Sequence, residues 1–466
     1  MKWSKYQQNI YKDVADGEGH TIVEAIAGGS KTTVLLESLN HIPEGKSWLF
    51  VAFNKRIAEE LQRRAPSSFN GECKTLHSLG LRTVFKAFPK IKVDNNKARF
   101  VLDRVIGKDK KLWELKASVA RTVGLAKSYL IDGAEYIDYI MENNDIDTCE
   151  IDRAQYIKYV QTAMEKCRED TSLVDFADMI WFPYVYNLSP QKYDRVFIDE
   201  AQDLSAAQIS LALSACKQGG RVMATGDKNQ AIYSWAGASL NSLENLKKKL
   251  QAKSLPLSIS YRCPKSVVKE AQQFVPHMES APDAPDGIVK TITRKEMLKL
   301  AKPGCFILSR VNAPLVGLAL GFIKKSIPAI IQGRDIGQNL IVLIKKSRKK
   351  NLDSFLTWLD SWEKREVARL RKKRMDSESI TDKAACLRAL GQASHDLTEV
   401  KQKIKSLFED TDEHGKIVLS SIHRAKGLER DVVFILKSTL RTFSQEERNV
   451  YYVGISRAKQ SLFYVT

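Results

Sequence analysis

The sequence predicts an α/β protein with two parallel-sheet cores, each interrupted by a mainly helical insertion. The first observation is length, because 466 residues exceed what one ordinary hydrophobic core accommodates. The second is a recurring pattern in which a short apolar run ends in polar residues and is followed by a helical pattern. Apolar strands that alternate with helices are typical of parallel sheets. The third is that these runs form two sets, each divided by a long helical stretch.

The first set of strands predicts one core built from residues 1–85 and 179–257, with a Lys-rich helical insertion over residues 86–178. In a parallel α/β sheet, ligands bind at the carboxyl ends of the strands, which is where the polar residues fall here. The four runs are TIVEAIA from Thr21, SWLFVAF from Ser47, RVFIDEAQD from Arg195 and RVMATGD from Arg221.

The second set predicts a second core built from residues 258–340 and 411–466, with a basic helical insertion over residues 341–410. This insertion contains KKSRKK (345–350) and RLRKKRM (369–375), and such charge runs are usually solvated helix faces. The four runs are CFILSR from Cys305, KIVLSS from Lys416, DVVFIL from Asp431 and SLFYVT ending at Thr466.

The composition bounds the class of protein. A formal net charge of +19 favours a polyanionic partner, of which nucleic acid is the commonest inside cells, although a basic surface can also serve solubility alone. No apolar run approaches the roughly 20 residues that span a bilayer, and the N-terminal segment lacks a signal-peptide pattern. We therefore expect an intracellular protein with no membrane partner, cytoplasmic if bacterial or phage-encoded. Seven cysteines without a CxxC pair predict reduced thiols rather than a disulfide framework or a zinc site.

A phosphate site is predicted at TIVEAIAGGSKTT, where a strand and a Gly-containing turn lead into a helix. Backbone N–H groups of such a turn bind phosphate, a lysine reaches the β- and γ-phosphates, and a hydroxyl binds Mg²⁺. The usual pattern has glycine six residues and one residue before the lysine, and here these positions are Ala25 and Ser30. The expected nucleotide-binding residues of the loop are Ala27, Gly28, Gly29, Ser30, Lys31, Thr32 and Thr33, with Thr32 also a magnesium ligand.

A pair of carboxylates follows the predicted strand RVFI and supplies the groups that the phosphate loop lacks. Asp199 is expected to hold Mg²⁺ and Glu200 to act as the general base that orients the attacking water. An acidic pair after a strand is often only a turn, but the word DEAQ followed by Asp203 is much more specific.

With these two motifs in place, the sequence resembles the UvrD/Rep/PcrA group of superfamily 1 helicases, whose further motifs follow in order. In the first core the resemblance implies an adenine contact at Gln7 in WSKYQQNIY and a γ-phosphate contact at Gln230 in GDKNQAIYSWAGA. Family members usually have arginine where this chain has Ala236, so this position departs from the family motif. The implied DNA contacts of the first core are Phe53, Asn54, Thr75, His77, Tyr233 and Trp235.

In the second core, LSISYRCP resembles the fourth motif and implies that Tyr261 stacks on adenine and Arg262 reaches the γ-phosphate. VLSSIHRAKGLERDVVF resembles the fifth, and NVYYVGISRAK matches the sixth, in which Arg457 is the second arginine finger. From the fifth motif the resemblance implies DNA contacts at His423 and Lys426 and a nucleotide contact at Glu429.

The resemblance implies two RecA-like cores, ATP and Mg²⁺ as cofactors, and single-stranded DNA and single-strand/duplex junctions as substrates. It implies an ATP-dependent DNA helicase that moves 3′ to 5′ and couples hydrolysis at the cleft between the cores to strand separation. The chain is shorter than typical bacterial members, which suits a compact, phage-type enzyme. Two alternatives stay open. One is a translocase that strips proteins from DNA without unwinding it, and the other is a non-hydrolysing nucleic-acid-binding relative, favoured by Ala25 and Ser30.

Overall fold

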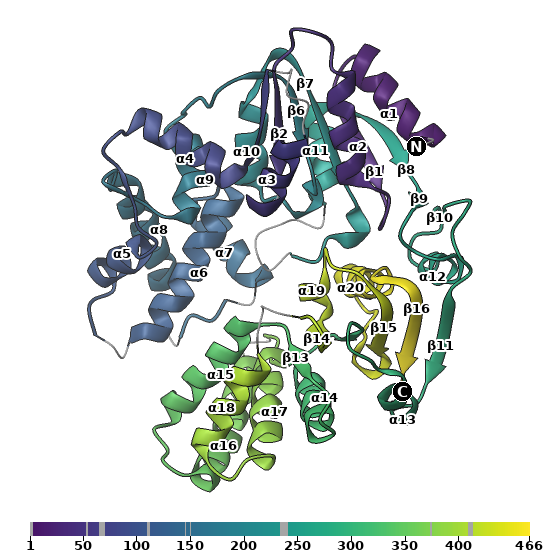
Figure 1. Cartoon of the computed structure of the whole chain (residues 1–466). Coiled ribbons are helices and arrows are strands. Elements are labelled where there is room, and N and C mark those ends of the chain that lie inside the picture. Colours follow the sequence, from purple (N-terminus) through teal and green to yellow (C-terminus); the bar gives the residue numbers. More distant parts are fainter. Residues whose placement is uncertain are drawn as a thin grey trace. The chain divides into compact units, whose positions relative to one another are not determined.

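The structure is a computed structural model that describes residues 3–52, 55–64, 70–109, 112–144, 146–149, 151–233, 241–372, 375–408 and 413–466. The chain divides into two compact units, Met1–Ser258 and Ile259–Thr466, which are described separately (Figure 1). Within the described residues, no helix has the length and apolar character needed to cross a membrane.

Unit 1 contains a six-stranded parallel sheet in the order β3-β2-β6-β7-β1-β8. Alternate residues of β2 serve the two faces, because Leu49 and Val51 belong to one hydrophobic core and Trp48 and Phe50 to the other. The strands are β1 (Thr21–Ala25), β2 (Trp48–Ala52), β3 (Gly71–Thr75), β6 (Tyr193–Ile198), β7 (Cys216–Gly226) and β8 (Lys253–Leu257).

Helices cover both faces of this sheet. The core that contains Leu49 also takes in residues of α4, α10 and α11, and the core that contains Trp48 takes in residues of α1 and α2. The helices are α1 (Lys5–Asp16), α2 (Lys31–Ser38), η1 (Leu39–His41), α3 (Lys55–Arg64), α4 (Leu76–Ala87), α10 (Ala206–Ser214) and α11 (Ser242–Leu250).

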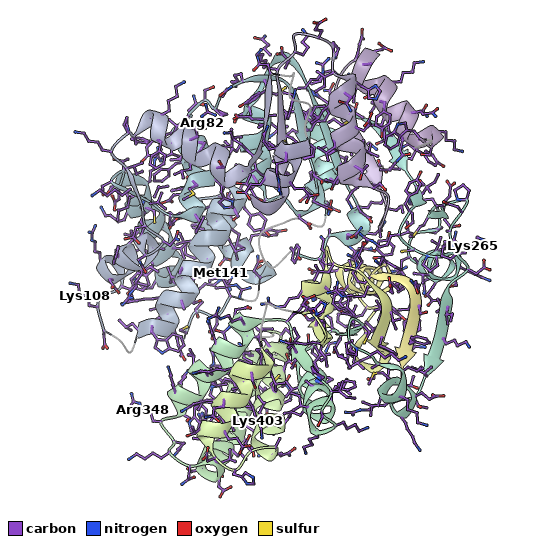
Figure 2. The ribbon with its side chains drawn as sticks, in the orientation of Figure 1. Arg82, Lys108, Met141, Lys265, Arg348 and Lys403 are labelled. Atoms are coloured by element: carbon purple, nitrogen blue, oxygen red, sulfur yellow. The ribbon has the colours of Figure 1, made fainter. Side chains whose placement is uncertain are left out.

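A helical region with its own hydrophobic core separates β3 from β6 in the chain. Met141, labelled in Figure 2, is one of its buried residues. The region contains α5 (Lys97–Val105), α6 (Trp113–Tyr129), α7 (Ala134–Asn143), α8 (Arg153–Glu169), α9 (Phe176–Val185) and the short pair β4 (Lys92–Val93) and β5 (Leu173–Val174).

Unit 2 contains a second six-stranded parallel sheet, in the order β11-β16-β15-β12-β14-β13. The strands are β11 (Ile288–Ile292), β12 (Phe306–Ser309), β13 (Ala329–Ile331), β14 (Ile417–Ser421), β15 (Arg430–Leu436) and β16 (Ala458–Val465), with a separate pair β9 (Ile259–Ser260) and β10 (Glu279–Ser280). The associated helices are α12 (Lys265–Ala271), α13 (Arg294–Leu300), α14 (Ala313–Lys324), α19 (Ile422–Ala425), η6 (Lys437–Thr439) and α20 (Gln445–Ile455).

The described residues between β13 and β14 form four further helices: α15 (Arg334–Ser347), α16 (Leu352–Lys372), α17 (Glu378–Gln392) and α18 (Leu397–Leu407). They share one hydrophobic core with the sheet, since Phe355 and Leu387 cluster with Ile307 and Leu419. Arg348, labelled in Figure 2, is exposed at the end of α15. The predicted fold class, two RecA-like parallel cores with helical interruptions, is confirmed.

Candidate nucleotide-binding site and nucleic-acid contacts

The loop between β1 and α2 is a tight turn that ends at Lys31, the first residue of α2. Gly28 has a φ of +73°, and a Cβ at Gly29 would lie 3.1 Å from the carbonyl oxygen of Ile26. Ser30 is itself left-handed, with φ +61° and ψ +33°, and makes no side-chain capping bond to α2 in the described structure. The first N–H groups of α2 are therefore not capped by Ser30, as an anion site at a helix N-terminus requires.

The two carboxylates that follow β6 lie beside this loop, because β7 is the only strand between β6 and β1 in the sheet order. Lys31 Nζ is 3.4 Å from Glu200 Oε1. The Thr32 hydroxyl donates to Asp199 Oδ2 at 2.6 Å, and the Thr225 hydroxyl donates to Asp199 Oδ1 at 3.0 Å. Burial, and next the charge of Glu200, raise the pKa of Asp199. A cation at this carboxylate would favour its ionised form.

The end of β7 adds a third carboxylate, the buried Asp227, which the sequence interpretation missed. Gln230, in η4 (Lys228–Gln230), donates through Nε2 to Asp227 Oδ2 at 2.7 Å, and burial raises the pKa of Asp227. Gln202, in η3 (Ala201–Asp203), accepts from the Asp227 N–H and donates to Glu200 Oε2 at 2.6 Å. Gln230 and Glu200 are thus connected through Gln202 and Asp227. The sequence signal that could have identified Asp227 is the recurrence of Asp and Gln in both DEAQD and GDKNQ.

The oxygen atoms of Thr32 and Asp199 suit a Mg²⁺ ion, since a hydroxyl and a carboxylate oxygen are hard ligands that already lie within hydrogen-bond distance. No cluster of three or more His, Cys, Asp or Glu that could hold a metal occurs among the described residues. This donor set fits an ion that takes one or two protein oxygens and completes its coordination with phosphate and water.

Gln7 lies in the first turn of α1 and is buried. It forms a capping box with Ser4, whose N–H donates to Gln7 Oε1 at 2.9 Å. The amide therefore fixes the start of α1, and its adenine contact stays a prediction. Ala27 is a buried residue of the phosphate loop, and Thr33 is half-buried in the first turn of α2.

The structure places Thr75 and His77 at the junction of β3 and α4. The Thr75 hydroxyl accepts from the Ser78 N–H and caps α4. Burial lowers the pKa of His77, whose ring lies edge-on to Phe176 at 5.8 Å. Phe176 is 56% exposed, an unusual state for phenylalanine, and sequence reasoning missed it because only tertiary contact places it beside His77. Tyr233 is half-buried, whereas Phe53, Asn54, Trp235 and Ala236 lie outside the described residues.

In unit 2 the fourth, fifth and sixth motifs meet. Arg262 forms an ion pair with Glu429, and its Nη1 donates to the Ser456 carbonyl at 3.4 Å. Tyr261, the preceding residue, is exposed. Arg457 is 1% exposed. Its guanidinium donates to the carbonyls of Val453 at 2.9 Å and Leu428 at 3.1 Å. Both arginines are thus held within unit 2, and their contact with a γ-phosphate stays a prediction.

His423 and Lys426 lie at the start and end of α19, directly after β14. Burial, followed by the charges of Arg310 and Lys426, lowers the pKa of His423 to about 3. His423 is therefore neutral at physiological pH, and its DNA contact, which stays a prediction, would use hydrogen bonding rather than a positive charge.

The two parallel-sheet cores and the Lys31–Thr32 loop beside Asp199 and Glu200 define a P-loop protein with two RecA-like cores. The chain belongs to the UvrD/REP helicase family. The family's N-terminal domain matches residues 4–251, and the UvrD-like helicase C-terminal domain matches residues 324–466. The resemblance to the UvrD/Rep/PcrA group of superfamily 1 is thereby confirmed.

Similar proteins carry helicase names. A probable DNA helicase of Mycoplasma pneumoniae is 23% identical, over 96% of this chain and 80% of its own length. DNA helicase II of Haemophilus influenzae is 25% identical, over 56% of this chain and 39% of its own length. F-box DNA helicase protein 1 of Schizosaccharomyces pombe is 25% identical, over 94% of this chain and 55% of its own length. The chain thus matches most of the first relative but only part of the other two.

Proposed function

We propose that the chain is an ATP-dependent DNA helicase that moves along single-stranded DNA from 3′ to 5′ and separates strands at single-strand/duplex junctions. The observation that carries this proposal is the group formed by Lys31, Thr32, Asp199 and Glu200. It combines a phosphate-binding cation, a pair of oxygen ligands for a metal and a carboxylate base, which are the parts that phosphoryl transfer to water requires.

In the proposed reaction, Lys31 and the loop N–H groups hold the phosphates, and Glu200 orients and deprotonates the attacking water. Thr32 and Asp199 would hold Mg²⁺, and the ion would neutralise phosphate charge. Gln230 contacts the γ-phosphate and is linked to Glu200 through Asp227 and Gln202.

Arg262 and Arg457 complete the proposed set, because arginine's planar fork stabilises the charge that develops on the γ-phosphate. Both belong to unit 2, whereas Lys31 belongs to unit 1. The proposed cycle therefore needs both units for one hydrolysis event, and this requirement would couple hydrolysis to movement along the strand.

The proposed DNA contacts combine hydrogen-bonding and aromatic side chains with a basic surface. His77 and Phe176 form an aromatic pair in unit 1, and Lys426 offers a cation in unit 2. Stacking tolerates any base, and phosphate contacts carry no sequence information, so binding should be tolerant of sequence and should weaken steeply with salt.

The test combines ATP hydrolysis, with and without single-stranded DNA, and strand separation on duplexes with a single 3′ or 5′ overhang. We expect DNA-stimulated hydrolysis and unwinding of the 3′-tailed duplex. Unwinding that needs a 5′ overhang would overturn the polarity. Stimulated hydrolysis that displaces a bound protein from DNA without unwinding would indicate a translocase, and no hydrolysis would indicate a binding relative.

A further inference from the structure

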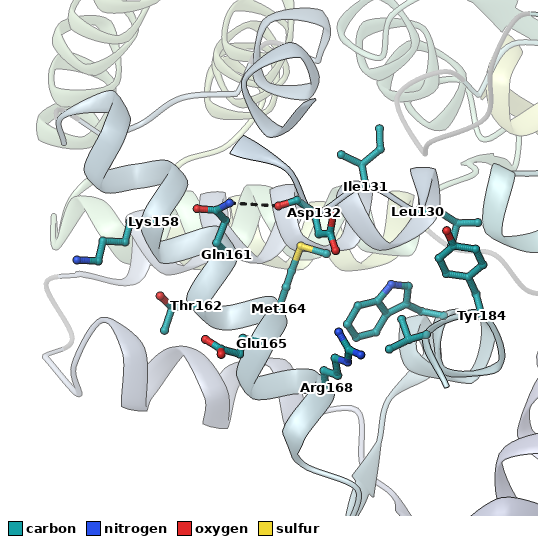
Figure 3. Close-up of a pocket in the computed structure, with 12 residues that line it drawn as sticks. Leu130, Ile131, Asp132, Lys158, Gln161, Thr162, Met164, Glu165, Arg168 and Tyr184 are labelled. Carbon is teal, nitrogen blue, oxygen red and sulfur yellow. Dashed lines mark hydrogen bonds between the residues drawn. The ribbon is translucent and has the colours of Figure 1, made fainter. Parts of the chain in front are cut away.

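A pocket of about 360 Å³ lies in the helical region of unit 1, between α8, α9 and the segment that follows α6 (Figure 3). Its apolar wall includes Trp181 and Tyr184 of α9, Met164 of α8 and Leu130. Trp181 is buried, whereas Tyr184 is 54% exposed. The pocket therefore offers an accessible aromatic ring above an apolar floor, at the small end of the volumes that ligand sites occupy.

The polar lining of this pocket consists mainly of four charged side chains of mixed sign: Asp132, Lys158, Glu165 and Arg168. None of the four forms an ion pair with another residue that the structure describes. Gln161 donates to the Asp132 carbonyl at 3.2 Å, as the dashed line in Figure 3 marks. The pocket thus supplies both hydrogen-bond donors and acceptors to a ligand, with two cations at opposite ends of the α8 face.

A second pocket, of about 140 Å³, is lined by residues of α4, α6, α9 and α10, among them His77, Phe176 and Lys127. Phe176 begins α9, and Tyr184 follows it on the same helix at a distance of roughly 12 Å. Lys127 lies near the end of α6, three residues before Leu130. Both pockets are thus lined by α9, whose Phe176 lies beside His77, an expected DNA contact, and whose Tyr184 lines the larger pocket.

We propose that the pocket at Tyr184 is a nucleobase subsite that accepts one unpaired base of the DNA strand. The inference rests on the proposed function. It adds a contact with the DNA strand that lies outside the family motifs. Tyr184 provides the stacking surface, and Lys158 and Arg168 face the phosphates on either side of the base. The negative charges of Asp132 and Glu165 would repel the phosphates of a DNA backbone. Their oxygen atoms can instead accept hydrogen bonds from the edge of a base.

The carboxylates also give the subsite a preference. Asp132 and Glu165 can only accept hydrogen bonds when ionised, and exocyclic amino groups of cytosine, adenine and guanine donate to such acceptors. Thymine has no amino group, and its one ring donor, N3–H, lies between two carbonyl oxygens that carboxylates repel. The subsite should therefore favour oligo-dC over oligo-dT, superimposed on binding that is otherwise tolerant of sequence.

The experiment measures the affinity of the full chain for fluorescently labelled oligo-dC and oligo-dT of equal length by anisotropy. Tyr184→Ala should weaken the binding of dC by about fivefold or more, the loss that corresponds to one stacked base. Tyr139→Ala is the matched control, because Tyr139 is an exposed tyrosine of α7 that does not line this pocket. DNA-independent ATP hydrolysis should be unchanged in both variants.

Glu165→Ala tests the preference separately. Removing a negative charge should strengthen the binding of both oligonucleotides, so the informative quantity is the ratio of the two affinities, which should move toward one. Glu169→Ala, on the same helix but outside the pocket, removes the same charge and should leave the ratio unchanged.

The outcomes separate this inference from the proposed function. If the wild-type chain binds no single-stranded DNA, the proposed function fails. If it binds DNA and hydrolyses ATP but Tyr184→Ala and Glu165→Ala behave like their controls, the subsite is overturned while the function stands. Equal affinity of the wild-type chain for dC and dT would overturn the role of the carboxylates.

Discussion

Ser30 adopts a left-handed backbone conformation, φ +61°, that glycine adopts at lower cost, because only a side chain clashes there. We predict that Ser30→Gly raises the free energy of unfolding by up to about 1 kcal/mol and changes ATP turnover only modestly. Urea denaturation and steady-state hydrolysis measure the two effects. Ser30→Ala keeps the Cβ and should not stabilise. A rise in turnover from almost nothing would instead show that Ser30 disables the wild-type loop.

Lys31 and Glu200 form an ion pair but have different predicted roles. Lys31→Ala should weaken both ATP binding and turnover, because a phosphate contact is lost. Glu200→Gln should keep ATP bound and lower turnover by about a hundredfold or more, because the base is lost while the shape is retained. Nucleotide titration and single-turnover hydrolysis separate the two effects. Glu244→Gln, an exposed carboxylate of α11, is the control. Wild-type turnover in Glu200→Gln would refute the assignment.

His423 has a folded-state pKa of about 3, below its usual 6.5. The unfolded chain therefore takes up a proton first as pH falls, so this group's contribution to stability is present above about pH 6.5 and is lost as pH falls toward 3. We predict that His423→Asn reduces the loss of stability between pH 6.5 and 5, as measured by urea denaturation. His414→Asn serves as the comparison, because it replaces an exposed histidine away from Arg310 and Lys426. An identical pH dependence in His423→Asn and wild type would contradict the neutral buried state.

At the scale of elements, three helices of unit 1 are joined by a buried ionic group. Asp178 of α9 forms ion pairs with Lys97 of α5 and Lys127 of α6, both at 2.7 Å, and all three side chains are buried. We predict that Asp178→Ala destabilises the protein by about 3–5 kcal/mol, because two buried lysines lose their counter-charge. Chemical denaturation measures this loss.

Two variants make that prediction specific. Glu169→Ala removes the acid of an exposed ion pair with Lys166 and should change stability by less than about 1 kcal/mol. The triple change of Lys97→Met, Lys127→Met and Asp178→Leu should recover most of the loss, since apolar packing can replace a buried ionic group. An Asp178→Ala protein with unchanged stability would show that the lysines do not depend on this carboxylate.

At the scale of the whole molecule, the proposed cycle requires an arginine of unit 2 to act on a phosphate held by unit 1. Arg457→Lys tests this better than Arg457→Ala, because the alanine variant would leave the carbonyls of Val453 and Leu428 without their donor. We predict that Arg457→Lys retains single-strand affinity within a few-fold and loses ATP turnover and unwinding. Anisotropy, phosphate release and the 3′-tailed duplex assay measure these. Arg448→Lys, exposed on α20, is the control. Retained unwinding would exclude Arg457 from the catalytic set.

The sequence by itself determined the two parallel cores, because apolar runs that end in polar residues indicate both the strands and the edge of the sheet where ligands bind. It also predicted catalytic or metal-binding roles for Lys31, Thr32, Asp199 and Glu200, since each belongs to a short local pattern. Only the tertiary structure decided which groups these residues meet. The Thr32–Asp199 hydrogen bond joins positions 167 residues apart, and the Lys127–Asp178 ion pair joins positions 51 apart. Asp227 enters the site because β7 lies between β6 and β1, and Arg457 is held by carbonyls of its own unit. No local pattern specifies such contacts, because strand order and helix packing depend on the burial of the whole chain.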